Sequence, residues 1–205
     1  AASDVYKRQI SRNRKRAEFL PWFKDVKFIS YDFHSDLQIT ETEVEGFRGL
    51  IHLAWQDLPN YNSSIHVKKN LPRSYKFIES LLNKGVNQVL IAGTCFEYGL
   101  KSGAISSSST TEPTTQYAIA KDTLRKKLTL LSFKKDFNLQ WARIFYMFGK
   151  GQNSNSIISQ LDFAIKNNQK VFHMSGGEQL RDYLPVEKAS EKLSNLYKSG
   201  NKGIF

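Results

Sequence analysis

The sequence predicts an α/β protein built on a doubly wound parallel sheet with helices on both faces. Short β-rich runs alternate with amphipathic helical segments along the chain. The strand runs are almost continuously apolar, as expected for strands that are buried on both faces. A polar stretch at 101–116 follows one of these strands, where such folds place their active-site loops.

Four strands and two long helices are expected in the main part of the chain. Helix 67–82 carries Leu71, Tyr75 and Ile78 at three- and four-residue spacing, and helix 117–134 carries Leu124 and Leu128 in the same way. The expected strands are 26–31, 49–55, 86–93 and 139–145. The 205 residues suffice for one domain, or for one domain and part of another.

The character of the sequence changes after Gly149-Lys150-Gly151. A helix at 156–167, a short strand at 171–174 and a turn at 175–177 are expected there. We therefore divide the chain into a main domain, 1–151, and part of a smaller lobe, 152–205, that returns to the main domain at its end.

The start of the chain departs from the pattern of this fold. A doubly wound nucleotide-binding sheet opens with an apolar strand and a glycine-rich turn, and here the earliest glycine is Gly46. We interpret residues 1–9 as a non-native leader and the sequence as an internal fragment that lacks the first strand. In the sheet order 3-2-1-4-5-6 that strand belongs between the strand ending near Arg12 and strand 49–55. The chain alone is therefore expected to fold poorly, to hold no cofactor and to be inactive.

Composition argues against several classes of protein. Aromatic residues at 13% argue against a disordered chain. The sequence has no apolar stretch near the roughly 18 residues that span a bilayer, and no secretory signal is visible. Cys95 is the only cysteine, which excludes a disulfide framework. The four histidines lack metal-ligand spacing: His34, His52, His66 and His173. We expect a cytoplasmic protein with no membrane partner and no metal.

The net charge is +11, and six basic residues against Asp4 place +5 of it in the first 16 residues. A basic excess of this size attracts phosphate-bearing partners. The rest of the chain shows no zinc finger, basic-region heptad or ribonucleoprotein motif. Nucleic-acid binding is therefore not expected, and a solvated basic surface is the plain alternative.

Two Tyr-x-x-x-Lys patterns occur, Tyr117/Lys121 and Tyr146/Lys150. Tyr146 ends a strand and has Gly149 before its lysine, so that pair does not share a helical face. Tyr117 opens an amphipathic helix, where residues four apart lie on one face. An ammonium group there is expected to lower the pKa of the phenol from about 10 toward neutrality, which suits proton transfer with a sugar hydroxyl. A core tyrosine with a surface lysine is the structural alternative.

Upstream of Tyr117, the segment Gly93-Thr94-Cys95-Phe96-Glu97-Tyr98-Gly99 follows a buried strand. With this segment and Tyr117/Lys121, the chain resembles the extended short-chain dehydrogenase/reductase family of nucleotide-sugar epimerases, dehydratases and reductases. The resemblance implies a Rossmann-like dinucleotide-binding domain and a small substrate-binding lobe. It also implies a catalytic set in which Thr94 binds the reacting oxygen, Tyr117 is the acid or base, and Lys121 lowers the pKa of Tyr117 and holds the nicotinamide ribose.

Further blocks resemble the family in the same order. They imply cofactor contacts, besides Tyr117 and Lys121, from Asp32, Phe33, Leu53, Ala54, Trp55, Asn70 and Ile144. They also imply substrate contacts from Cys95, Phe96, Tyr146 and Arg181, with Arg181 on the substrate diphosphate. Arg12 lies where the second strand ends, and an arginine there accommodates the 2′-phosphate of NADP rather than the free ribose of NAD. The expected cofactor is NADP or NAD, with NADP favoured.

One departure narrows the reaction. Dehydratases of the family carry an Asp-Glu pair directly after the catalytic threonine, and this chain has Cys95 and Phe96 there. We therefore predict oxidation or reduction at C4 of a nucleotide-linked 6-deoxyhexose. An epimerase on the same scaffold and a non-catalytic nucleotide-binding relative are the alternatives. Glu97 is interpreted as a structural or substrate-pocket residue, and the full-length protein is expected to be a homodimer.

Overall fold

In the computed structural model, which describes residues 7–32 and 40–205, a four-stranded parallel sheet forms the centre. Its strand order is β3-β4-β5-β8, where β3 is Gly49–His52, β4 is Gln88–Thr94, β5 is Asn138–Ile144 and β8 is Gly203–Ile204. The register pairs Gly49 with Gln88, and Thr94 with Ile144. The predicted parallel α/β architecture is confirmed.

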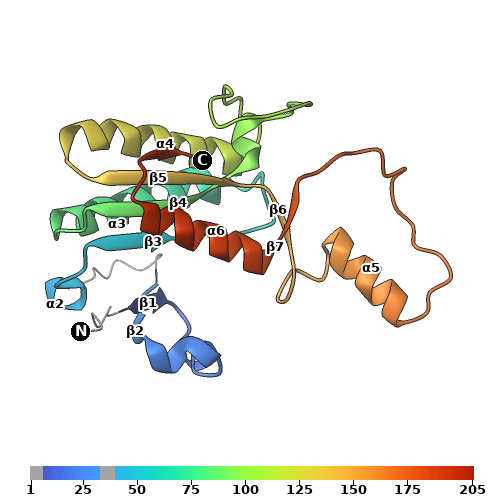
Figure 1. Ribbon diagram of the computed structural model, residues 1–205, viewed down its shortest axis with the longest axis horizontal. Helices are drawn as coiled ribbons and strands as arrows, with labels where there is room; N and C mark the ends of the chain where they lie inside the picture. The colour runs from blue at the N-terminus through green and yellow to red at the C-terminus, as the bar shows by residue number, and fades with distance from the viewer. Residues whose placement is uncertain (1–6, 33–39) are drawn as a thin grey trace.

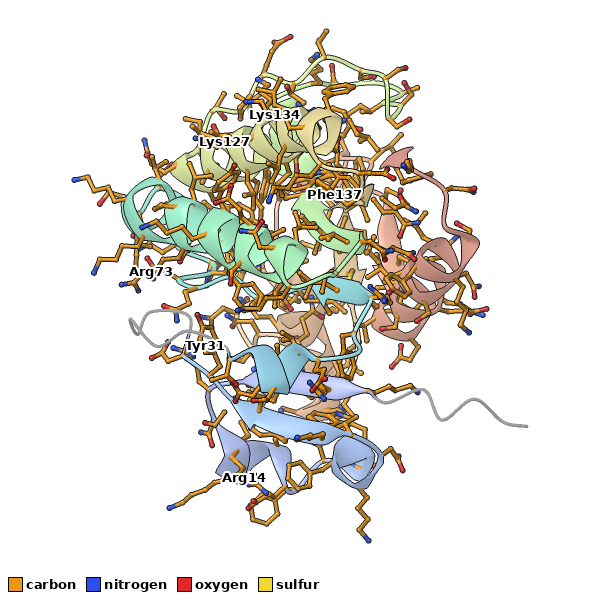
Figure 2. The ribbon with its side chains drawn as sticks, turned by 90° about the vertical axis from the view of Figure 1, so that its left-hand side faces the viewer. Arg14, Tyr31, Arg73, Lys127, Lys134 and Phe137 are labelled. Carbon is orange, nitrogen blue, oxygen red and sulfur yellow. The ribbon has the colours of Figure 1, made fainter. Side chains whose placement is uncertain are left out.

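Helices cover both faces of this sheet. Helix α3 (Leu71–Asn83) and helix α4 (Gln116–Lys134) lie side by side on one face, and helix α6 (Val186–Ser199) lies on the other (Figures 1 and 2). A π-helical turn, η2 (His66–Asn70), leads directly into α3. Figure 2 shows Lys127 and Lys134 on α4, and both side chains are exposed.

The core lies between the sheet and the two helices. Completely buried side chains include Val89 and Ile91 of β4, Leu124 and Leu128 of α4, and Trp141 of β5. Fully burying one such side chain stabilises a fold by about 1.5–3 kcal/mol. This core fixes the carboxyl end of β4 and the first turns of α4 relative to one another.

The first two strands form a separate layer. Strand β1 (Arg8–Ser11) pairs in parallel with β2 (Lys27–Ser30), and the two make a sheet of their own. Short helices α1 (Arg14–Ala17) and η1 (Pro21–Asp25) connect them, and α2 (Glu41–Val44) precedes β3. The break between β1 and β3 falls where the predicted strand order expects a strand to be lacking. Tyr31 joins this layer to the main core through Phe77, with ring centroids 5.6 Å apart.

The smaller lobe extends away from the sheet (Figure 1). It consists of strand β6 (Tyr146–Phe148), helix α5 (Ile157–Lys166) and strand β7 (Tyr183–Pro185), and β6 pairs in parallel with β7. Ser156 caps α5 by accepting a hydrogen bond from the backbone of Ser159.

Several expectations require correction. The strand predicted at 171–174 is wrong: that segment has no regular structure, because Val171 and Met174 are 64% and 56% exposed and no described strand pairs with it. Arg8 and Gln9, where no strand was expected, lie in β1. Helix α6 and strands β6 and β7 were not predicted. Within the described part of the chain, no helix is both long and apolar enough to cross a membrane.

Candidate functional site

The candidate site lies where β4 ends and α4 begins. Thr94 is the last residue of β4, and its side chain accepts a hydrogen bond from the backbone N–H of Phe96 as a short helical turn, η3 (Cys95–Tyr98), begins. Tyr117 lies in the first turn of α4, and its backbone N–H donates to the carbonyl oxygen of Tyr61 at 2.9 Å. The Thr94 side chain lies near the Tyr117 phenol and acts to lower the pKa of that phenol. The fold thus brings together the two residues that the sequence placed in one catalytic set.

Tyr117 lies among other rings and is 8% exposed. Its ring centroid is 6.0 Å from that of Trp55, 5.7 Å from Tyr61, 5.4 Å from His66 and 6.4 Å from Phe96. Burial among these rings raises the pKa of Tyr117 to about 12, although the Thr94 side chain acts to lower it. Tyr117 therefore holds its proton at neutral pH.

Lys121 lies one turn further along α4 and is 2% exposed. Its Nζ donates to the carbonyl oxygen of Ala92 at 2.7 Å and stands 4.1 Å from the centroid of the Trp55 ring. Burial lowers the pKa of Lys121 to about 7, while the carboxylate of Glu97 acts to raise it. The pKa of Tyr117 is raised, not lowered toward neutrality as expected, because burial outweighs the other influences on the phenol.

A network of hydrogen bonds holds the Trp55 indole N–H. The indole Nε1 donates to Nδ1 of His66 at 3.1 Å, and Nε2 of His66 is 2.8 Å from the carbonyl oxygen of Asn60. Asn70 donates through Nδ2 to the Gln56 carbonyl oxygen at 3.0 Å and lies 3.2 Å from Nδ1 of His66. His66 and Asn70 are both buried.

Glu97 occupies the centre of a second, fully buried network. Its Oε1 accepts from the backbone N–H of Thr94 at 2.9 Å and from Trp141 Nε1 at 2.9 Å. Its Oε2 accepts from Arg143 Nε at 2.8 Å, and Arg125 lies 3.7 Å away. A Cβ on Gly93 would lie 2.2 Å from Trp141 Nε1, so this contact requires glycine there. The structure gives Glu97 a structural role at the end of β4.

The candidate substrate residues come from two parts of the chain. Arg181 donates from Nη1 to the Tyr146 hydroxyl at 2.9 Å, and Arg181 is exposed. Cys95 and Phe96 are half-buried in η3. Burial raises the pKa of the Cys95 thiol, and the charge of Arg181 acts in the opposite direction.

The candidate cofactor residues are spread over several elements of the fold. Leu53 and Ala54 follow β3 and are exposed, and Ile144 pairs in register with Thr94. Arg12 and Asp32 follow β1 and β2 in the separate layer, so no described contact joins them to Thr94. Phe33 lies outside the described residues.

Tyr61, His66 and Trp141 are among the residues of these networks that were not predicted as site residues. His66 had a usable signal, because it lies four residues before Asn70 at the start of a helix. Tyr61 had none, since it comes from a loop that only the fold brings to Tyr117. Within residues 7–32 and 40–205, no group of three or more potential metal-binding side chains occurs.

A cavity of about 450 Å³ lies beside the Glu97 network. It is lined by Arg125, Arg143, Ile204 and residues 107–111 of the polar loop. Arg143 donates to the Ser107 carbonyl oxygen at 3.2 Å, which holds this loop to β5. The cavity lining contains none of Thr94, Tyr117 and Lys121.

Comparison with known proteins gives one family and a consistent set of relatives. The sequence profile of the NAD dependent epimerase/dehydratase family matches residues 3–197. The dTDP-6-deoxy-L-talose 4-dehydrogenase (NAD(+)) of Aggregatibacter actinomycetemcomitans is 31% identical over 185 residues, which cover 90% of this chain and 66% of that protein.

Solved structures confirm the fold. A UDP-N-acetylglucosamine 4-epimerase from Methanobrevibacter ruminantium M1 superposes with a TM-score of 0.80 at 21% identity, over 96% of this chain and 66% of that one. DesIV, a dTDP-glucose 4,6-dehydratase from Streptomyces venezuelae, superposes with a TM-score of 0.79 at 17% identity, over 98% of this chain and 66% of that one. The chain thus spans just under two thirds of the length of these relatives.

Proposed function

Because this chain belongs to the NAD dependent epimerase/dehydratase family, we propose that it oxidises or reduces C4 of a nucleotide-linked 6-deoxyhexose with a nicotinamide cofactor. The observation that carries this proposal is the closeness of the Thr94 side chain to the Tyr117 phenol, with Lys121 one helical turn away. The similarity to a dTDP-6-deoxy-L-talose 4-dehydrogenase supports the choice of sugar class and of C4.

In the proposed reaction Thr94 and Tyr117 bind the same sugar oxygen. The Thr94 hydroxyl orients that oxygen, and the Tyr117 phenol exchanges a proton with it. With a pKa of about 12, Tyr117 is held as the acid, the form that protonates a ketone oxygen during reduction. Arg181, exposed beside Tyr146, supplies a planar guanidinium for the phosphate groups of the substrate.

Lys121 is suited to hold the ribose of a nicotinamide dinucleotide. An ammonium group carries three N–H donors, and Lys121 directs one of them to the Ala92 carbonyl oxygen. Ribose hydroxyl oxygens are natural acceptors for its other donors. When bound, the nicotinamide would donate hydride to C4 or accept it. Leu53, Ala54 and Ile144 would line the cofactor beyond β3 and β4.

The relatives whose names state a cofactor state NAD. The argument from Arg12 favours NADP and finds no support among them. We therefore propose NAD as the working cofactor, and we treat Arg12 as the residue whose substitution tests the choice. A homodimer in the full-length protein stays a prediction, which a solution molar mass would test.

The test supplies the full-length protein with NAD or NADP and a dTDP-linked 6-deoxyhexose. We expect reduced nicotinamide to accumulate in proportion to a 4-keto sugar identified by mass spectrometry. Interconversion of two sugars without net reduction of the cofactor would instead support the epimerase alternative. Binding without either product would support a non-catalytic relative and contradict the proposal.

Tyr117→Phe gives the residue-level test. General acid–base catalysis contributes about 10²–10⁴-fold, so we expect a loss of kcat in that range. Cofactor affinity, measured by fluorescence titration, is expected to stay near normal, because Lys121 and not the phenol holds the ribose. Tyr75→Phe on α3, whose hydroxyl bonds Glu79 at 3.1 Å, is the matched control and should keep its activity. An equal loss of affinity and rate would contradict this division of roles.

A further inference from the structure

The pair formed by Trp55 and His66 has no part in the proposed proton transfer, yet its two side chains are held together by both a ring contact and a hydrogen bond. The two rings lie nearly parallel, at 20°, with centroids 6.3 Å apart. Their edges are joined by the 3.1 Å bond from Trp55 Nε1 to His66 Nδ1. Trp55 belongs to the loop after β3 and His66 to η2, so the pair joins two elements beside Tyr117 and Lys121.

The hydrogen bonds of His66 determine its tautomer. An indole N–H can only donate, so His66 Nδ1 must be the acceptor. The Asn60 carbonyl oxygen can only accept, so His66 Nε2 must carry the proton. Asn70 Nδ2, 3.2 Å from Nδ1, adds a second donor to the same nitrogen. His66 is therefore neutral and completely buried, and its Nδ1 accepts the Trp55 indole N–H.

The fixed indole faces the Lys121 amine. Nζ lies 4.1 Å from the Trp55 ring centroid and 2.7 Å from the Ala92 carbonyl oxygen. A cation over an indole face is attracted by the ring quadrupole, and more strongly when both groups are shielded from water. Lys121, at 2% exposure, meets that condition.

We propose that Trp55, locked by the neutral Nε2–H tautomer of His66, is a positioning residue that holds the Lys121 ammonium group in the candidate site. Only the effect of this contact on turnover depends on the proposed function. The contact is a property of the chain itself and is measurable without substrate or cofactor.

The charge on Lys121 supplies the test. Its protonated form is opposed by burial and favoured by the indole face and by Glu97 of η3. The other titratable groups near it are His52 of β3, Tyr117 of its own helix and His66 behind Trp55. A leucine at position 55 keeps an apolar side chain there and leaves Glu97, His52 and Tyr117 in place, although it removes the hydrogen bond to His66. Loss of the indole should therefore lower the pH at which Lys121 titrates.

The measurement is NMR on the full-length protein with ¹³Cε-labelled lysine, and a Lys121→Arg variant assigns the resonance. Trp55→Leu should lower the Lys121 titration midpoint by roughly 0.5–1.5 pH units, the range expected for a shielded cation–π contact. Trp22→Leu, the same substitution at a tryptophan of η1, is the matched control and should leave the midpoint unchanged. Trp55→Phe, which keeps an aromatic face and the fold, should lower it by a smaller amount.

The role of His66 has its own readout. The chain has three tryptophans, and each gives one indole N–H resonance. His66→Phe should move the Trp55 resonance toward that of an indole with no nitrogen acceptor, and leave that of Trp141 in place.

An unchanged Lys121 midpoint in both Trp55 variants would overturn the positioning role. An unmoved Trp55 resonance in His66→Phe would overturn the lock. Neither readout requires turnover, so a full-length protein without activity would contradict the proposed function and leave this test intact.

Discussion

Replacing Glu97 by glutamine is expected to destabilise the chain more than any surface substitution. The glutamate is completely buried, and both of its oxygens accept hydrogen bonds from N–H donors. Trp141 Nε1 lies 2.9 Å from one oxygen and 3.1 Å from the other. Glutamine must place its NH₂ group at one of these two positions, whichever way the amide turns. A donor then faces donors in a site that no solvent reaches.

The size of the destabilisation follows from two losses. One is the hydrogen bond that the introduced NH₂ group cannot accept, and the other is the negative charge beside Arg143. The charge partner of Arg143, at 2.8 Å and with its own side chain 2% exposed, disappears. Removing one partner of a buried ion pair costs about 3–5 kcal/mol. A domain of ordinary stability has about 5–15 kcal/mol in total. We therefore expect Glu97→Gln to remove a large share of the free energy of unfolding and to lower the denaturation midpoint accordingly.

The assay is equilibrium unfolding in urea, followed by tryptophan fluorescence. Glu112→Gln is the matched control, because Glu112 pairs with Lys101 on the surface and its side chain is 68% exposed. Its midpoint should coincide with that of the unsubstituted chain. A Glu97→Gln chain whose free energy of unfolding stays within about 1 kcal/mol of the unsubstituted value would refute the reasoning, since the lost buried pair alone exceeds that.

Two further predictions concern Lys121 and Arg12. The pKa of Lys121 is about 7 in the folded chain against 10.5 ordinarily, so between these values the unfolded chain binds a proton that the folded chain does not. The free energy of unfolding should therefore rise with pH between these two values. The Lys121→Met variant should show a flatter rise and be more stable at pH 7. An unchanged slope in this variant would count against a buried amine with a lowered pKa. Arg12→Glu, at an exposed position after β1, should shift kcat/KM toward NAD and away from NADP. An unaltered ratio of the two kcat/KM values would remove Arg12 from the cofactor site.

Long periodic segments of this chain could be predicted from sequence to within one or two residues. Strand β4 and helix α4 were expected at 86–93 and 117–134, because a continuous apolar run and a helical stripe are both local patterns. Strands β6 and β7 are three residues each and pair only with one another. Such strands form through tertiary contact and leave no periodic signal. Helix α6 had a signal, Ala189, Leu193 and Leu196 at helical spacing, that was overlooked.

The candidate site likewise has a part that could be predicted from the sequence and a part that could not. The closeness of Thr94 and Tyr117 was predictable, because one ends a strand and the other begins the helix that packs on it. The network through Trp55 and His66 was not, since it depends on a loop whose path no local pattern determines. The direction of the Tyr117 pKa shift was also missed. Spacing gives the proximity of a lysine, whereas the pKa depends on how many rings exclude water from the phenol.

These effects make the charge of Lys121 the most sensitive property of the site. Burial lowers its pKa to about 7, so the amine is only partly protonated under neutral conditions. Glu97 and the Trp55 face both favour the charged form, and they act from different elements, η3 and the loop after β3. Because its pKa is close to neutral pH, the charge of Lys121 responds to small changes at either Glu97 or Trp55. We therefore expect Trp55 and Glu97, which exchange no proton in the proposed reaction, to govern the fraction of the protein in which Lys121 carries its ammonium charge.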